Sequence, residues 1–401
     1  MRVVVTTESR FEMGPDGIPR CSSGTFDYRF WQRYLDTFER VTVVARCQQT
    51  RTISGSPVSG RGVTVWPLLN SHGAWGAVQN WRHWQATLAP LLREHSAWIL
   101  RVPGQIGGAL AGPLKRRGIP FAVEVVGDPA TAFGRESFRH PLRPCIQWFF
   151  SRMLRSACSE AIAASYVTRE FLQRHYPPNR RAFTTDYSSV ALPPESFAAR
   201  ARSYSDRLVA PKIVSVATMS QRYKGQHHLI EAVYRCQQAG RRVELTLVGD
   251  GQYRHDLERQ VARRQLGSQV RFAGQLSAGD QVRQELDRGD LFVLASVGAE
   301  GLPRAIIEAQ ARGVPCIGTR LSGIPELLRD QELVTPGNDK ELAQTILDLA
   351  DDPDRLRACS VHNLQTAHHY RASELSRRRS EFYEFIKRRS QRPGSVRRRA
   401  A

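Results

Sequence analysis

The chain has 401 residues, 41% of them hydrophobic, and its formal net charge of +20 favours polyanionic partners such as nucleic acid, an anionic membrane face or phosphorylated substrates. Its length and apolar content suit about two or three globular domains, and no apolar run reaches the roughly 18–20 residues of a membrane-spanning helix. The seven cysteines are scattered without a CxxC pair, which excludes a disulfide or zinc framework and indicates reduced thiols in a cytoplasmic protein.

Strands alternate with helices along nearly the whole chain, which predicts an α/β protein with parallel sheets. In the first half the pattern predicts strands near 3–7, 41–45, 63–66, 98–102, 121–126 and 161–164, and helices near 28–38 and 75–92. Near 182–206 the pattern weakens into Thr, Ser, Pro and Ala, which is typical of a linker.

The second half restarts with a strand near 212–217, and the pattern predicts further strands near 243–248, 270–273, 291–295 and 314–318. Two βαβ halves joined by a linker imply an interdomain cleft, which is a common place for ligand sites. We therefore expect four segments: an N-terminal domain over 1–195, a linker over 196–210, a C-terminal domain over 211–365, and a C-terminal helix with a basic tail over 366–401.

Several polar residues follow the second-half strands. In a parallel sheet the loops after the strands gather on one edge, where ligands of open α/β sheets bind. The residues expected there are two cations, a glycine turn and two carboxylates, namely Arg222, Lys224, Gly249, Asp250, Gly251, Glu300 and Glu308. Cations and helix N-termini suit phosphates, whereas carboxylates accept hydrogen bonds from sugar hydroxyls. The combination predicts a nucleotide-sugar site.

Glu300 and Glu308 stand in the spacing E-x(7)-E, with Gly-Leu-Pro directly after Glu300 and Lys224-Gly225 upstream. This set closely resembles the retaining glycosyltransferases of family 4, and the resemblance covers Lys212 to about Leu328 well. It implies the GT-B fold, in which two Rossmann-like domains with parallel sheets face each other across a cleft.

By this resemblance, Glu308 would hydrogen-bond the donor ribose, and Glu300 with the backbone of Gly301, Leu302 and Pro303 would hold hydroxyls of the transferred sugar. Lys224 would bind the diphosphate, so Lys224 and Glu300 are the expected catalytic residues. The implied reaction moves a hexose-type sugar from a UDP or GDP donor, with retention, to a lipid-linked or glycan acceptor in bacterial cell-surface polysaccharide or glycolipid synthesis.

No cofactor or metal is expected. Lys224, with Arg222 as a second candidate, and helix-start N–H groups would stabilise the departing diphosphate electrostatically. The histidines show no ligand spacing, and the single Asp-x-Asp lies in a polar turn.

The chain departs from the family pattern at two places. The usual arginine five or six residues before the lysine falls on Thr218 or Met219, so Arg222 would substitute from another backbone position. The usual histidine near the reacting sugar is missing from the N-terminal half, where Asp128 is the nearest polar candidate for an acceptor hydroxyl. An Asp in a Gly-Asp-Pro turn is the structural alternative.

The loop expected after the first strand faces the cleft in the GT-B arrangement. Its Arg10 could touch the acceptor or the diphosphate, and Gly24 precedes the next helix. We name Arg10 and Asp128 as the acceptor-side candidates.

The C-terminus is strongly basic, with ten Arg and Lys against two acids between 377 and 399. Phe382, Tyr383, Phe385 and Ile386 interleave with these charges and could form one apolar helix face, which packs either on the body or in a lipid interface. The basic segment is therefore either a solvated tail or a contact with the anionic inner face of the membrane.

Two other functions stay open on the sequence. The chain could be another GT-B enzyme, such as a nucleotide-sugar epimerase or a phosphorylase, or a basic non-enzymatic protein that binds nucleic acid or membrane. No RNA- or DNA-binding signature accompanies the charge, so no specific nucleic-acid partner is expected.

Overall fold

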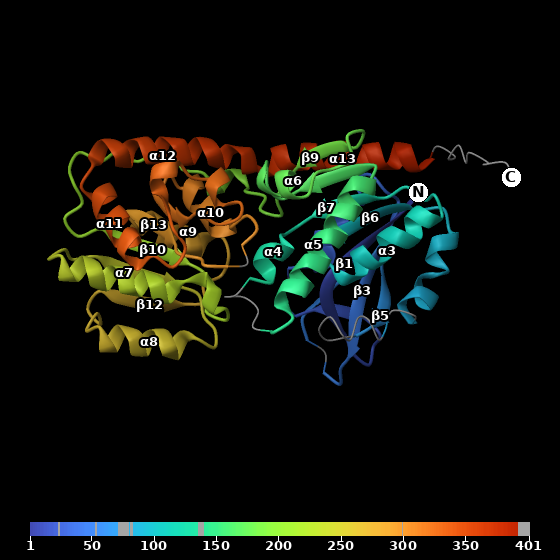
Figure 1. Cartoon of the computed structure of the whole chain (residues 1–401), viewed down its shortest axis with the longest axis horizontal. Coiled ribbons are helices and arrows are strands. Elements are labelled where there is room, and N and C mark those ends of the chain that lie inside the picture. Colours follow the sequence, from blue (N-terminus) through green and yellow to red (C-terminus); the bar gives the residue numbers. More distant parts are fainter. Residues whose placement is uncertain are drawn as a thin grey trace.

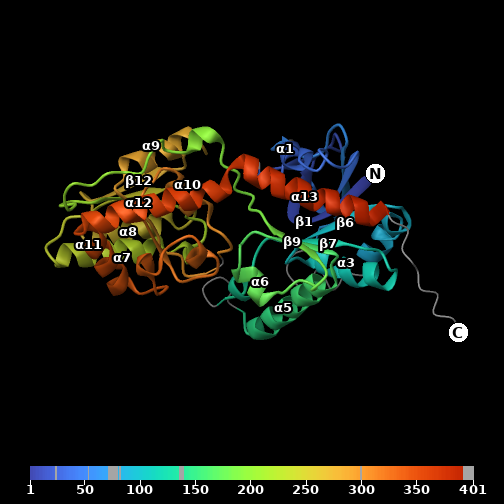
Figure 2. The ribbon, with the colours of Figure 1, turned by 90° about the horizontal axis from the view of Figure 1, so that it is seen from above.

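The computed structural model describes residues 1–22, 25–52, 54–70, 80, 83–134, 140–298 and 300–391. Two α/β domains lie side by side, and the consecutive helices α12 (Pro353–Ala367) and α13 (Ala372–Gln391) run across both of them (Figure 1 and Figure 2). The expected helix near 75–92 lies partly outside the described residues. Of the residues in this range that the structure describes, 80 and 83–88 are helical. The predicted pair of parallel-sheet domains is confirmed.

The N-terminal domain is built on a sheet whose parallel strands lie in the order β5-β3-β1-β6-β7-β8-β9, with β2 and β4 as a short antiparallel extension of β1. The strands are β1 (Arg2–Met13), β2 (Pro19–Cys21), β3 (Arg40–Gln49), β4 (Ser56–Pro57), β5 (Val63–Leu69), β6 (Ala97–Val102), β7 (Ala122–Val125), β8 (Ala163–Tyr166) and β9 (Phe183–Asp186).

Strand β9 corrects the expected linker over 182–206, because it pairs in parallel with β8 at the edge of the N-terminal sheet. An edge strand is covered incompletely, and none of the four residues of β9 is fully buried. The buried apolar run that marks the inner strands is therefore missing from its sequence.

The helices of the N-terminal domain cover both faces of this sheet. They are α1 (Tyr28–Gln32), α3 (Gln105–Arg116), α4 (Pro129–Ala132), α5 (Arg143–Glu160) and α6 (Phe171–His175), with short 3-10 turns η1 (Leu91–Arg93) and η2 (Pro194–Ser196). One core joins the central strands to α3 and α5 through Val4, Ile106 and Leu154. The other core lies beneath α1 and α13.

Helix α1 is shorter than the expected 28–38. Asp27 caps its start by accepting the amide of Phe30 at 3.2 Å. Beyond Gln32 the amides of Tyr34 and Leu35 bond three residues back, to Trp31 and Gln32, so tighter turns replace the α-helix.

The C-terminal domain has an all-parallel sheet in the order β12-β11-β10-β13-β14-β15. Its strands are β10 (Lys212–Val216), β11 (Glu244–Val248), β12 (Val270–Gly274), β13 (Leu291–Leu294), β14 (Cys316–Thr319) and β15 (Leu333–Val334). The strand order reverses between the neighbours β10 and β13, and ligands of doubly wound sheets bind at such a point.

Helices again cover both faces of the C-terminal sheet. They are α7 (Gln226–Gln238), α8 (Arg254–Arg263), α9 (Asp280–Arg288), α10 (Arg304–Ala311), α11 (Asp339–Ala350) and α12, with 3-10 turns η3 (Arg222–Lys224), η4 (Ile324–Glu326), η5 (Asp330–Glu332) and η6 (His368–Tyr370). Two buried cores result, one on each side.

Helix α13 packs against the N-terminal domain. This packing shows whether its apolar face lies on the protein body or is available to a lipid interface. Phe382, Tyr383 and Ile386 are at most 1% exposed and pack with Val3 and Trp31 in the core beneath α1. Burying a large apolar side chain contributes roughly 1.5–3 kcal/mol, so the face belongs to the body of the protein and not to a lipid interface. The basic residues from Arg392 onward lie outside the described residues.

The two domains contact each other through η4 and the start of α6. The carboxylate of Glu326 accepts the backbone amides of Arg169 at 2.6 Å and Glu170 at 3.0 Å. Within the described ranges, no helix is both long and apolar enough to cross a bilayer.

Candidate active site

The centre of the site is an ion pair between Lys224 and Glu300. Lys224 ends η3, which follows β10, and Glu300 follows β13, so both lie where the strand order reverses. The Nζ of Lys224 lies 2.6 Å from Oε1 of Glu300, and Ser296 Oγ donates to the same oxygen at 2.7 Å. Glu300 is only 5% exposed, and the ammonium of Lys224 balances its charge.

Gly225 allows the loop of Lys224 to approach β13. It adopts φ +75°, and a Cβ there would lie 1.8 Å from the carbonyl oxygen of Ala295. Any side chain would push this loop away from β13, and Lys224 with it. A backbone bond of 2.8 Å from Val297 N to the Tyr223 carbonyl joins the same two loops.

Helix α10 starts directly behind this ion pair. Pro303 is its N-terminal cap residue and no described side chain caps its first amides, which leaves N–H groups available for an anion. Glu308 lies one turn into the helix and pairs with Arg304 at 2.7 Å. The expected loop from Glu300 through Gly301, Leu302 and Pro303 therefore leads from the ion pair into a helix N-terminus.

The turn Gly249-Asp250-Gly251 follows β11 at the same sheet edge. Gly249 adopts φ +129°, and a Cβ there would lie 2.1 Å from the carbonyl oxygen of Ala217, so this turn packs tightly on the loop after β10. The Gly251 amide and the Arg254 guanidinium hold the pKa of Asp250 below its usual range. Asp250 thereby orders the turn as an anion.

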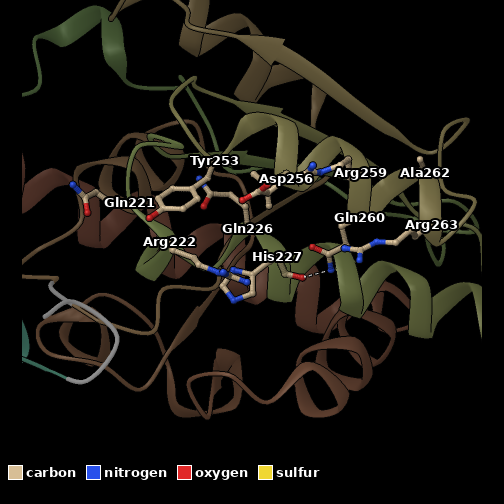
Figure 3. Close-up of a pocket in the computed structure, with 11 residues that line it drawn as sticks. Gln221, Arg222, Gln226, His227, Tyr253, Asp256, Arg259, Gln260, Ala262 and Arg263 are labelled. Atoms are coloured by element: carbon tan, nitrogen blue, oxygen red, sulfur yellow. Dashed lines mark hydrogen bonds and ion pairs between the residues drawn. The ribbon is translucent and has the colours of Figure 1, made fainter. Parts of the chain in front are cut away.

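Arg222 lies apart from Lys224. It is exposed and lines a groove of about 560 Å³ between α7 and α8, beside His227 and Tyr253 (Figure 3). Burial, with the charges of His228 and Arg222, lowers the pKa of His227 to about 4. The structure thus brings Lys224, but not Arg222, to Glu300.

Asp128 serves as a structural cap in this structure. It is 5% exposed, and its Oδ1 accepts the amide of Ala130 at 2.9 Å and the hydroxyl of Tyr176 at 2.5 Å. These bonds fix the start of α4, which favours the turn reading over an acceptor-binding role.

Arg10 lies within a strand and not in a loop, because β1 continues to Met13 after a register shift between Thr6 and Arg10. It is exposed and stands opposite Arg46 on β3. Gly24, which was expected near it, lies outside the described residues.

The sequence reading missed a buried charged cluster in the N-terminal domain. Glu124 on β7 is 2% exposed and accepts hydrogen bonds from Arg101 Nη1 at 2.6 Å and from three tyrosine hydroxyls at 2.8–3.2 Å. The signal was a single charge inside each of two otherwise apolar strands, Ala97–Val102 and Ala122–Val125. A charge in such a strand requires a buried partner.

In the part of the chain that the structure describes, no three His, Cys, Asp or Glu side chains are grouped so as to hold a metal ion. The positive groups nearest to the switch point are Lys224 and the amides of α10. This arrangement can bind a phosphate group and can accept hydrogen bonds from hydroxyls at Glu300 and Glu308.

Comparisons with known proteins show which family the C-terminal domain resembles. The family model of the glycosyl transferases group 1 matches residues 210–352. The chain is 32% identical over 170 residues to the amylovoran biosynthesis glycosyltransferase AmsK of Erwinia amylovora, a match that covers 40% of each chain. It is 24% identical over 338 residues to protein CapJ of Staphylococcus aureus, with 80% of each chain covered.

A solved structure gives the same two-domain architecture. HepE of Anabaena, in complex with UDP, superposes with a TM-score of 0.65 at 17% identity, covering 95% of this chain and 99% of that chain. At this level of identity the likeness concerns the fold, and it agrees with the predicted GT-B arrangement.

Proposed function

The chain belongs to the glycosyl transferases group 1 family through residues 210–352, and from this premise we propose that it transfers a hexose-type sugar from a nucleotide-diphosphate donor to a glycan or lipid-linked acceptor. The similarity to AmsK, a glycosyltransferase of amylovoran biosynthesis, supports a role in bacterial cell-surface polysaccharide or glycolipid synthesis.

One observation carries this proposal, the contact of 2.6 Å between Lys224 and Glu300 at the switch point of the matched domain. On donor binding the diphosphate would take over the ammonium of Lys224, and the released carboxylate of Glu300 would accept sugar hydroxyls. Glu308, one turn into α10, would accept a ribose hydroxyl. Because Lys224 and Glu300 are paired with each other, neither is an uncompensated charge in the protein interior.

Leaving-group stabilisation is the chemical task of the site. The departing diphosphate gains negative charge, and Lys224 with the N-terminal amides of α10 would stabilise that charge by fixed electrostatics. We propose on this ground that transfer needs no metal, and we propose retention because the chain resembles the retaining glycosyltransferases of family 4. Transfer that is unchanged in excess EDTA, with an α-configured product from an α-configured donor, is the expected result.

The donor can be identified by thermal unfolding with UDP-, GDP- and ADP-sugars. We expect one of these to raise the unfolding temperature, and UDP-glucose is the first to test because HepE was solved with UDP. The same ligand should not stabilise the Lys224→Ala variant to the same extent. No stabilisation by any nucleotide sugar would contradict the proposed function. Conversion of the donor sugar without an acceptor would instead indicate an epimerase.

We also propose that the protein associates peripherally with the anionic inner face of the membrane. Leu142, Trp148 and Phe149 are 60%, 64% and 56% exposed, and all three lie at or within α5. Arg152 stands one turn after Trp148, with its guanidinium 5.8 Å from the centre of that ring. Exposed aromatic rings beside cations suit the interface of an anionic bilayer. This support comes from α5, whereas the apolar face of α13 is already buried.

A further inference from the structure

The N-terminal domain contains two adjoining hollows at the edge that faces the donor site. One of about 240 Å³ is lined by Arg33 and Glu124 among others, and one of about 320 Å³ lies between the irregular middle of β1, at Thr7–Ser9, and the end of β6. Both are lined by Phe26, Arg101 and Val126, so they form one continuous site, here called the N-terminal cavity.

The N-terminal cavity lies next to the loop that follows Glu300. A Cβ added to Gly301 would lie 3.5 Å from the carbonyl oxygen of Val126 and 4.0 Å from Cγ2 of Val167, and both of these residues line the cavity. A molecule in the cavity would therefore reach the place where the transferred sugar is proposed to sit.

Two carboxylates line this cavity, Glu8 and Glu124, and both already have partners. Oε2 of Glu8 pairs with Arg46 at 2.6 Å, and its Oε1 accepts the amide of Ile106 at 2.8 Å.

Oε1 of Glu124 accepts the hydroxyls of Tyr187 at 2.8 Å and Tyr383 at 3.2 Å, while Oε2 accepts Arg101 Nη1 at 2.6 Å. The hydroxyl of Tyr34 lies 3.1 Å from both oxygens. With its lone pairs occupied, Glu124 holds Arg101 in place and offers no further acceptor.

The hydrogen-bonding capacity that is left consists mostly of donors. Nε of Arg33 is buried and has no hydrogen-bond partner among the described residues. Its Nη2 lies 3.9 Å from Glu124, too far for a good ion pair, and its guanidinium is held 3.7 Å from the centre of the Phe30 ring. Since Arg46 balances Glu8, the guanidinium groups of Arg33 and Arg101 face the single charge of Glu124, which leaves a net positive wall.

We propose that the N-terminal cavity binds an oxyanion of the acceptor, a carboxylate or a phosphate close to the accepting hydroxyl, through Arg33 and the free N–H groups of Arg101. The inference rests on the proposed transferase function and specifies its acceptor as an acidic one. Nη2 of Arg33 donates to the hydroxyl of Tyr34 at 3.3 Å, but the buried Nε has no acceptor among the described residues. A buried N–H without an acceptor is unfavourable, and an oxyanion would supply that acceptor with charge-assisted hydrogen bonds.

The test uses ligand-observed NMR titration of the full chain with D-glucuronate, glucose 6-phosphate and D-glucose, each with and without saturating UDP. We expect one or both anions to bind at least tenfold more tightly than D-glucose, and the tighter of the two identifies the oxyanion. Arg33→Gln should weaken anion binding by about 10- to 100-fold, the loss typical of one charge-assisted contact, and Arg33→Lys should restore part of it.

Arg40→Gln is the matched control, because Arg40 is exposed at the start of β3, on the edge of the sheet away from the cleft. It should leave anion binding unchanged, and UDP should bind the Arg33→Gln variant as it binds the wild type. Any of three results would overturn the proposal: the anions bind no better than D-glucose, UDP displaces them, or Arg40→Gln weakens their binding as much as Arg33→Gln does. Failure of UDP to bind the wild type would contradict the donor site instead, while the titrations without UDP still judge the cavity.

Discussion

At the scale of single residues, the pairing of Lys224 with Glu300 determines which chemical groups a donor must carry. Each charge is the other's partner, so a donor that separates them must offer both a negative group to the lysine and hydroxyls to the carboxylate. Free phosphate offers only the first, and a neutral sugar offers only the second. The pair therefore favours molecules that carry both, which nucleotide sugars do.

Replacing Lys224 by Ala should lower kcat by about 10²- to 10³-fold, because one fixed donor to the leaving group is lost. The matched control is Lys212→Ala, an exposed lysine at the opposite end of β10, which should keep wild-type turnover. Steady-state kinetics of the purified variants decide this, and near wild-type kcat in Lys224→Ala would rule out the assigned role.

Glu308→Ala should weaken binding of the nucleotide by about 10- to 100-fold, since a hydrogen bond to a charged acceptor contributes about 1.5–3 kcal/mol in a partly buried site. Arg304→Ala removes the ion-pair partner of Glu308 but leaves the carboxylate, so it should bind the nucleotide at least as tightly as the wild type. Isothermal titration with UDP measures both, and equal losses in the two variants would speak against a ribose contact.

At the scale of elements, the C-terminal helix packs on the body of the protein, and a different helix, α5, exposes apolar side chains. The basic, aromatic α13 is bound to the body by Phe382, Tyr383 and Ile386, and Arg378 pairs with Asp186 of β9 at 2.8 Å. The exposed apolar surface lies instead on α5, where positions 145, 148, 149 and 152 follow helical spacing and are all exposed.

The double substitution Trp148→Ser with Phe149→Ser should reduce binding to vesicles that contain anionic phosphatidylglycerol by about tenfold or more, because two exposed rings lose their insertion into the interface. Vesicle co-sedimentation measures the effect. Val361→Ser on α12, which is 45% exposed in the wild type, is the control and should leave binding unchanged. Equal binding by the double variant would exclude α5 as the contact.

At the scale of the whole molecule, Glu124 connects three distant parts of the chain. It receives Arg101 from β6, Tyr34 from the turn after α1, and Tyr383 from α13, which lies 259 residues further on. Burial opposes its ionisation, but the charges of Arg101 and Arg33 outweigh that effect and hold the pKa of Glu124 below its usual range. The carboxylate is therefore charged, and it ties the last helix to the N-terminal sheet.

Glu124→Gln should lower the free energy of unfolding by about 3–5 kcal/mol at pH 7, because it leaves the buried Arg101 charge without its partner. Since the folded pKa is lowered, this contribution is complete above the unfolded pKa of about 4.3 and is lost as pH falls through the folded value. Urea unfolding should show a constant difference from the wild type at neutral pH that shrinks below about pH 4. The exposed Glu381→Gln on α13 should change stability by less than about 1 kcal/mol.

The donor half of the molecule could be predicted from the sequence because its signals are local. Hydrophobic period, glycine turns and the spacing of Glu300 and Glu308 each depend on a few neighbouring residues, and parallel strands bring their following loops to one edge. The β10 and β13 strands then lie side by side as that rule requires, and Lys224 meets Glu300 across them. Arg222 could not be placed in this way, because the direction of a loop side chain is set by what packs beside it.

The sequence by itself determined the two α/β domains and the strand that leads to each loop, and it predicted that Lys224 and Glu300 lie at one edge of the sheet. Only the tertiary structure decided that the apolar face of α13 is covered, that Asp128 caps a helix, and that Arg33, Arg101 and Glu124 meet beside the donor loop. The physical reason is distance along the chain: apart from the local cap at Asp128, these contacts join residues 23 or more positions apart and depend on how separate strands and helices pack.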